Sequence, residues 1–198
     1  MLVVTLLGIV SYTAVSNYAA GEDYSRGTVI KKEMSLIQNS FIRFYNDCMP
    51  SDTELDEIGA YGLWCLFTAE SPVKKNCPWG REYNFYKNKG WRGPYMNPEG
   101  EAEIVSPSQG STGQKTGNGI NVPVIYTPYY RKDLSQSRGC YYRVIIPEFN
   151  GVKQYGKITL VNPGADGVLD TSDLLGSETA SVVPGGDDTV LQLLPGGA

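Results

Sequence analysis

The feature that most constrains this chain is the apolar run at its N-terminal end. Residues 1–10, MLVVTLLGIV, carry no charge, and as a helix they would extend about 15 Å, roughly half the apolar thickness of a bilayer. No basic residue precedes the run and no clear small-residue cleavage site follows it, so the pattern is not that of a secretory signal peptide. Two interpretations remain open: a buried core helix, or a helix whose partner is lipid or neighbouring helices.

An amphipathic helix is predicted for residues 28–48. Its apolar side chains recur at steps of four and three residues and form one stripe, while charged side chains occupy the opposite face. The stripe consists of Ile30, Met34, Ile37, Phe41 and Phe44. The helix should end before Pro50, because the residue before a proline is disfavoured in the helical region. We expect one long helix, interrupted near Gly21 and Gly27, of which only the second half packs on its own domain.

Composition excludes several function classes. Hydrophobic residues make up 41% of the 198 residues and charged residues 19%, which is typical of a folded chain. The net charge of −4 and the scattered lysines and arginines argue against a nucleic-acid surface. The chain has no histidine, which removes the commonest general base and every nucleophile–histidine arrangement. We therefore expect a protein that is not an enzyme.

The rest of the chain predicts an α+β domain with long loops. Residues 51–71 indicate a short helix or helical turns, capped by Ser51 or Asp52, with Leu63, Trp64, Leu66 and Phe67 as the buried part. Short β-branched and aromatic runs at 122–130, 140–147 and 156–162 predict three consecutive antiparallel strands, with turns at 132–139 and 149–153. We expect a small antiparallel sheet whose apolar face covers the stripe of the long helix.

Two loop regions carry possible functional signals. Residues 71–101 are rich in aromatics, namely Trp79, Tyr83, Phe85, Tyr86, Trp91 and Tyr95, which either anchor the loop on the core or form a glycan or base-stacking platform. Anchoring is the simpler interpretation. Residues 106–121 are poor in apolar side chains and predict a surface loop.

Aspartates concentrate near the C-terminal end. Asp166, Asp170 and Asp173 lie in a glycine-rich segment, and Asp187 and Asp188 follow it. Calcium prefers several carboxylate and carbonyl oxygens, but the spacing of an EF-hand is absent. The alternatives are a solvated acidic turn and, less favoured, a pair of catalytic carboxylates.

The opening segment MLVVTLLGIVSYTAV resembles the N-terminal helix of the type IV pilin and pseudopilin superfamily. Met1 matches the residue just after the glutamate that, in this family, follows a basic leader and a glycine. Residues 90–96, GWRGPYM, are similar to a loop that covers the first helix in the major pseudopilin of type II secretion, whereas VIYTPYYRKD stands where that family has Asp-Pro-Trp-Gly-x-Pro-Tyr.

The resemblance implies a structural filament subunit. Residues 1–20 would form the membrane and filament-core half of the helix, and residues 21–198 a pilin-like globular domain. The expected partners are further copies of the chain, other pilin-like subunits and, before assembly, the inner membrane of a bacterium, with the domain in the periplasm or at the cell surface. Alternatives are a type IV pilin for adhesion or motility and a membrane-anchored glycan-binding module.

The same resemblance implies one calcium ion. Its ligands would be Asp166, Asp187 and Asp188, with Asp170 as a further candidate. The insertion 174–186 separates the two acidic groups more widely than is usual in the family.

Four cysteines, Cys48, Cys65, Cys77 and Cys140, show no CxxC spacing. In an exported domain we expect disulfides rather than free thiols. One arrangement joins Cys65 to Cys77 and Cys48 to Cys140, although four cysteines allow three connectivities.

Overall fold

The fold was analysed in a computed structural model that describes residues 2–71, 77–78, 84, 87, 89–96, 102–105, 122–129, 140–169, 172–173, 182–184 and 186–195. The predicted loop 106–121, the predicted turn 132–139 and most of the aromatic residues of the 71–101 segment lie outside these residues.

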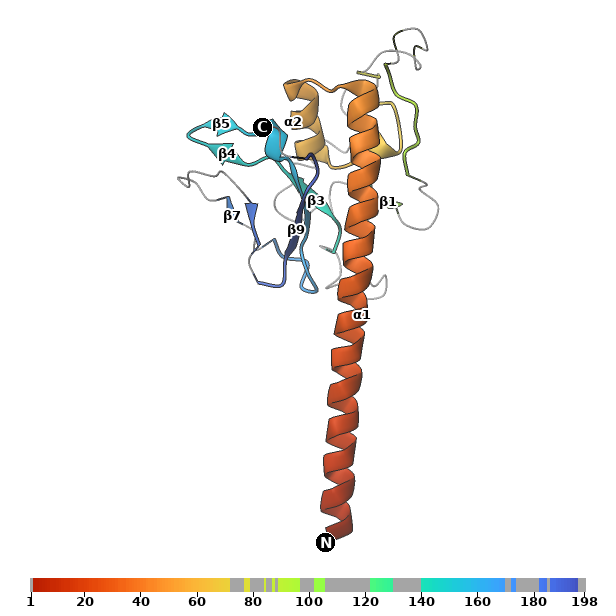
Figure 1. Ribbon diagram of the computed structural model, residues 1–198, viewed down its shortest axis with the longest axis vertical. Coiled ribbons are helices and arrows are strands. Elements are labelled where there is room, and N and C mark those ends of the chain that lie inside the picture. The colour runs from red at the N-terminus through yellow and green to blue at the C-terminus, as the bar shows by residue number, and fades with distance from the viewer. Residues whose placement is uncertain are drawn as a thin grey trace.

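One helix dominates the structure. Helix α1 runs from Leu2 to Cys48 over 47 residues without a break. The prediction of one long helix is confirmed, and the predicted interruption near Gly21 and Gly27 is wrong. No atom would lie within 4 Å of a Cβ added at Gly27, so no close neighbour forces a kink there. The C-terminal half of α1 lies beside the rest of the protein, and its N-terminal half extends clear of it (Figure 1).

The predicted apolar stripe forms the centre of the core. All five of its side chains are at most 3% exposed and belong to one cluster with residues of the sheet and of α2. On other faces of the same helix Leu36 is 53% exposed and Tyr24 is 81% exposed. The helical period therefore decides which side chains of α1 are buried.

A short second helix and a single helical turn cover the end of α1. Helix α2, Asp52–Tyr61, begins after Ser51, whose backbone N–H donates to Glu54 Oε2 at 2.6 Å. The 3-10 helix η1, Trp64–Leu66, follows. Leu63, Trp64 and Leu66 are buried and Phe67 packs partly buried against the core, as predicted.

The sheets are small and antiparallel, so the chain is α+β as predicted. The central sheet has the order β3-β6-β9, in which β6 (Thr159–Asn162) lies between β3 (Arg143–Ile145) and β9 (Thr189–Gln192). In the described part of the chain, three two-stranded sheets accompany it. They pair β1 (Ala102–Val105) with β2 (Val122–Ile125), β4 (Glu148–Phe149) with β5 (Val152–Lys153), and β7 (Ser172–Asp173) with β8 (Val182–Val183).

The predicted set of three consecutive strands is only partly right. Strands β3 and β6 pair, but the third strand of that sheet is β9, and β2 pairs with β1 instead. The end of β2 and the residue after it still lie beside the chain before β3, because Tyr142 N–H donates to the Ile125 carbonyl at 2.9 Å and Tyr126 bridges Tyr141. The third strand of the central sheet therefore comes from beyond the insertion and pairs with β6, at the edge opposite to β3.

The predicted turn 149–153 is the hairpin between β4 and β5. Asn150 and Gly151 both have positive φ, at 51° and 77°, which is the conformation of a two-residue hairpin loop. Asparagine and glycine tolerate this conformation, which explains why the turn was readable from sequence.

Candidate functional site

The aspartate loop follows the central strand β6. Residues 164–167 form the turn, with positive φ at Gly164 (70°) and Gly167 (67°). Asn162, which is fully buried at the end of β6, accepts a hydrogen bond from Gly164 N–H through Oδ1 at 3.3 Å. Glycine is required at position 164 on two grounds, because its φ is positive and a Cβ there would overlap the Asp187 carboxylate.

The structure brings two of the predicted ligands to this one turn. Asp166 Oδ1 accepts from Val168 N–H at 2.8 Å, and Asp187 Oδ2 accepts from Ala165 N–H at 2.6 Å. Both side chains are exposed, whereas Asp188 is 9% exposed. The insertion therefore does not separate Asp166 from Asp187 in space. Asp170 lies outside the described residues.

A fixed positive charge lies under the same turn. Arg143 on β3 is 3% exposed and donates through Nη2 to the Gly167 carbonyl at 3.1 Å. Its guanidinium also lies over the Tyr141 ring, 5.0 Å from the ring centroid. This arginine, which sequence reasoning missed, offsets part of the negative charge that the aspartates bring to the loop.

The thiol of Cys140 is the third polar group at this turn. It donates to the Ala165 carbonyl with a sulfur–oxygen distance of 3.7 Å. Burial raises the pKa of Cys140, the negative charges of Asp166 and Asp187 raise it further, and Arg143 lowers it. The hydrogen bonds of Cys140, Asp187 and Arg143 to backbone atoms of residues 165 and 167 place these three side chains at the same turn.

The loop partly fits a calcium site. Two carboxylates and the carbonyls of a glycine-rich turn are the oxygen ligands that calcium takes. Each carboxylate already accepts a backbone hydrogen bond, which a purely structural acidic turn would also explain. Within the described part of the chain, no group of three acidic, cysteine or histidine side chains is close enough to hold a metal ion.

The cysteines fall into two neighbourhoods. All four are thiols in the structure. After burial in both cases, the negative charge of Cys77 contributes to the raised pKa of Cys48, and that of Cys48 contributes to the raised pKa of Cys65. Among the described groups that act on the pKa of Cys140 there is no cysteine. The pairing of Cys48 with Cys140 and of Cys65 with Cys77, and the formation of disulfides, stay predictions.

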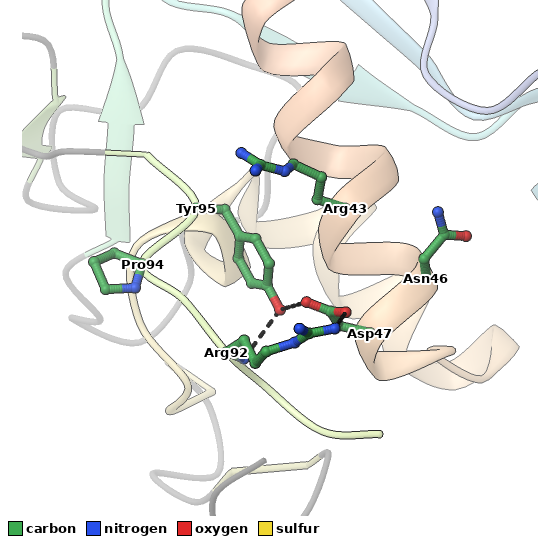
Figure 2. Close-up of a pocket in the computed structure, with 6 residues that line it drawn as sticks. All are labelled: Arg43, Asn46, Asp47, Arg92, Pro94 and Tyr95. Carbon is green, nitrogen blue, oxygen red and sulfur yellow. Dashed lines mark hydrogen bonds and ion pairs between the residues drawn. The ribbon is translucent and has the colours of Figure 1, made fainter. Parts of the chain in front are cut away.

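A second polar site lies at the C-terminal end of α1. A pocket of about 410 Å³ opens there between the helix and the 90–96 segment, as Figure 2 shows. Its lining residues are Arg43, Asn46, Asp47, Arg92, Pro94 and Tyr95.

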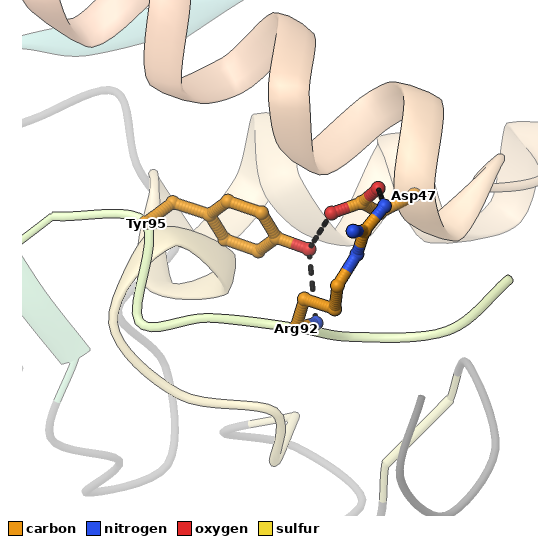
Figure 3. A network of polar contacts seen from close by, with 3 residues as sticks. All are labelled: Asp47, Arg92 and Tyr95. Atoms are coloured by element: carbon orange, nitrogen blue, oxygen red, sulfur yellow. Dashed lines mark hydrogen bonds and ion pairs between the residues drawn. The ribbon is translucent and has the colours of Figure 1, made fainter. Parts of the chain in front are cut away.

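Three of these residues form a closed polar network (Figure 3). Asp47 Oδ1 accepts from Arg92 Nη2 at 2.7 Å, and Asp47 Oδ2 accepts from the Tyr95 hydroxyl at 3.0 Å. The backbone N–H of Arg92 donates to the Tyr95 hydroxyl oxygen at 3.1 Å. Burial raises the pKa of Tyr95, so the phenol stays protonated and can donate to Asp47.

The 90–96 segment is anchored as its sequence predicted. Trp91 Nε1–H donates to the Cys65 carbonyl at 2.8 Å. The Tyr95 ring packs edge-on against both Phe44 and Trp91, with centroid distances of 5.9 Å. These two aromatics therefore anchor the loop on the core. The polar half of the site, Asp47 with Arg92, was not foreseen, because nothing in the sequence signals a pair 45 residues apart.

Comparison of the chain with known protein families, with curated proteins and with solved structures finds no match. Over the residues that the structure describes, no helix has the length and apolar content needed to cross a membrane.

Proposed function

We propose that this chain is a structural subunit of a pilus-like filament, closest in kind to a type II secretion pseudopilin. The observation that carries the proposal is the division of α1. The half that contains the buried stripe lies against the domain, and the half that contains the apolar run extends clear of it (Figure 1).

An apolar helix that leaves its own domain needs an outside partner. Removing apolar surface from water lowers the free energy by roughly 25 cal/mol per Å² of buried area. Parallel copies of α1 would bury residues 1–10 against one another, and before assembly the inner membrane would receive the same segment. The globular domain would then face outward, in the periplasm or at the cell surface, where other pilin-like subunits could join the fibre.

The anchored 90–96 segment favours a structural role over the glycan-binding alternative. Its two described aromatics, Trp91 and Tyr95, contact the core. A recognition platform would need aromatic faces that a sugar can reach.

The test is assembly of the full chain. We expect the double variant Leu6→Ser, Leu7→Ser to lose sedimentable fibres in electron microscopy while the domain still unfolds cooperatively. Val152→Ser is the matched control, because Val152 is an exposed apolar residue (62%) on the β5 hairpin. Absence of fibres in the unchanged protein would refute the proposal, and glycan binding by that protein would favour the tethered module. Fibres on the outer cell surface would favour an adhesion or motility pilin.

We further propose that calcium binds the aspartate loop through Asp166 and Asp187, with Asp188 and Asp170 as additional candidates. EDTA should then lower the melting temperature and calcium should restore it. In Asp187→Asn the calcium effect should disappear, whereas Glu70→Gln, at an exposed acid outside the loop, should keep it. A melting curve that is unchanged by EDTA would refute the calcium proposal without affecting the filament proposal.

A further inference from the structure

The described residues that line the pocket at the end of α1 include one acid and two cations. Its acid is compensated internally, because both oxygens of Asp47 accept hydrogen bonds from Arg92 and Tyr95. The Arg92–Asp47 ion pair measures 2.7 Å, and the Asp47 side chain is 15% exposed. The negative charge of Asp47 is therefore offset by Arg92 before any ligand enters the pocket.

Arg43 supplies the remaining charge. It lies one helical turn before Asp47 on α1 and is exposed, and Figure 2 shows it on the side of the helix that faces Tyr95. In the part of the chain that the structure describes, no acidic side chain is within ion-pair distance of Arg43. The described lining residues, with Arg43 and Arg92 against Asp47, thus carry a formal net charge of +1, on a protein whose net charge is −4.

The wall opposite Arg43 is held in place before any partner arrives. Gly90 N–H donates to the Asp47 carbonyl at 2.8 Å, and Tyr95 N–H donates to the Leu66 carbonyl at 2.8 Å. Together with the contacts of Trp91, these bonds fix the segment at both ends. A preorganised site loses little conformational entropy on binding.

We propose that this pocket is a contact site between copies, in which Arg43 binds an Asp or Glu carboxylate of a second copy of the chain. A guanidinium recognises a carboxylate through two parallel N–H donors, and a single surplus positive charge matches a single negative one. The described surface offers exposed acids of its own, among them Asp52, Glu70 and Asp166. The inference rests on the proposed function, which brings copies side by side.

The experiment compares Arg43→Glu with Lys31→Glu in the full chain. Both replace an exposed cation of α1 by glutamate, so the net charge changes equally, but Lys31 lies about 120° around the helix from Arg43. We expect Arg43→Glu to raise the protein concentration needed for fibre formation about tenfold, and Lys31→Glu to leave it within about twofold. Thermal melting should be the same in both variants, because neither side chain is buried.

The outcomes separate this inference from the filament proposal. Fibres in the unchanged protein and in Lys31→Glu, with a tenfold deficit in Arg43→Glu, would support the contact. Equal assembly of all three proteins, or an equal deficit in both variants, would overturn the contact and keep the filament. No fibres in the unchanged protein would overturn both. In a photo-crosslinking arm with the probe at position 43, crosslinks to an acidic segment of a second copy are expected, and crosslinks only within one copy would overturn the contact.

Discussion

The two halves of α1 share one backbone conformation but have different surroundings. From Ile30 to Phe44 the helix has a buried stripe and hydrogen bonds to distant strands, such as Gln38 Nε2–H to the Gln192 carbonyl at 2.6 Å. The N-terminal half extends away from the sheet and α2 (Figure 1). Tertiary packing stabilises the first region, whereas within the chain the second depends on helix propensity, and the proposed filament would supply its partners.

This contrast shows that helical structure alone does not define the domain. The same helix serves as a core element over one half and as an extension over the other. What separates the halves is the side-chain pattern, since the stripe returns every three or four residues from Ile30 onward.

The largest expected effect on stability comes from truncating a buried side chain in the packed half of α1. Phe41 is fully buried, with its ring 5.7 Å from that of Phe44, so Phe41→Ala should lower the free energy of unfolding by about 3–5 kcal/mol. Leu36→Ala on the exposed face should change it by less than about 0.5 kcal/mol. Urea unfolding measures both. Similar losses would show that α1 is not packed through the stripe.

The next largest effect is expected in the 90–96 segment, which packs against the C-terminal half of α1. A Cβ at Gly93 would come within 2.5 Å of the Trp91 ring and 2.9 Å of the Tyr95 ring. Gly93→Ala should therefore cost about 1–3 kcal/mol in the same assay. Gly156→Ala is the control, because nothing lies within 4 Å of a Cβ there. A neutral Gly93→Ala would mean that the aromatic anchors do not define this loop.

A smaller effect of opposite sign is expected where α1 leaves the core. Gly27 is helical with open space around it, so Gly27→Ala should raise stability by up to about 1 kcal/mol through helix propensity. Gly59→Ala in α2 should gain less or lose stability, because its Cβ would meet Ile146 Cδ1 at 3.0 Å. Circular dichroism during thermal unfolding compares them. A destabilised Gly27→Ala would show that the helix needs a bend at this residue.

The last effect is absent at neutral pH and appears only at alkaline pH in reduced protein. Burial raises the pKa of Cys48 from 9.0 to about 12, while a hydrogen bond with Tyr95 opposes the rise. A group whose pKa is raised on folding stabilises the fold fully below its unfolded pKa and loses that contribution as the pH rises. Unfolding free energy should thus fall between about pH 9 and pH 12, and less so in Cys48→Ala. Equal pH dependence in the two proteins would contradict this assignment.

Local periodicity explains how much of the fold could be predicted. The stripe, the second helix and the Asn150–Gly151 turn depend on neighbours within a few residues, and all three were correct. The pairing of β6 with its second neighbour, β9, could not be predicted from local periodicity. Strand β9 reaches the sheet from beyond the insertion, and strand choice depends on tertiary packing.

The candidate sites show the same limit. Glycine and aspartate chemistry indicated the turn at Asp166, but the buried guanidinium of Arg143 beneath it left no signal in the sequence. The aromatic anchors of the 90–96 segment were readable, whereas the Asp47–Arg92 ion pair was not. Side chains that meet across long stretches of chain are set by the whole fold.

The length of α1 has a mechanical consequence. At a rise of 1.5 Å per residue, the 28 steps from Leu2 to Ile30 give a lever arm of about 42 Å. A tilt of about 5° of the domain about Ile30 would move the helix tip sideways by about 4 Å, which approaches half the spacing between packed helices. The contacts at Phe41 and Tyr95, which hold α1 against the domain, therefore limit how far the Leu2 end of the helix moves sideways relative to the domain.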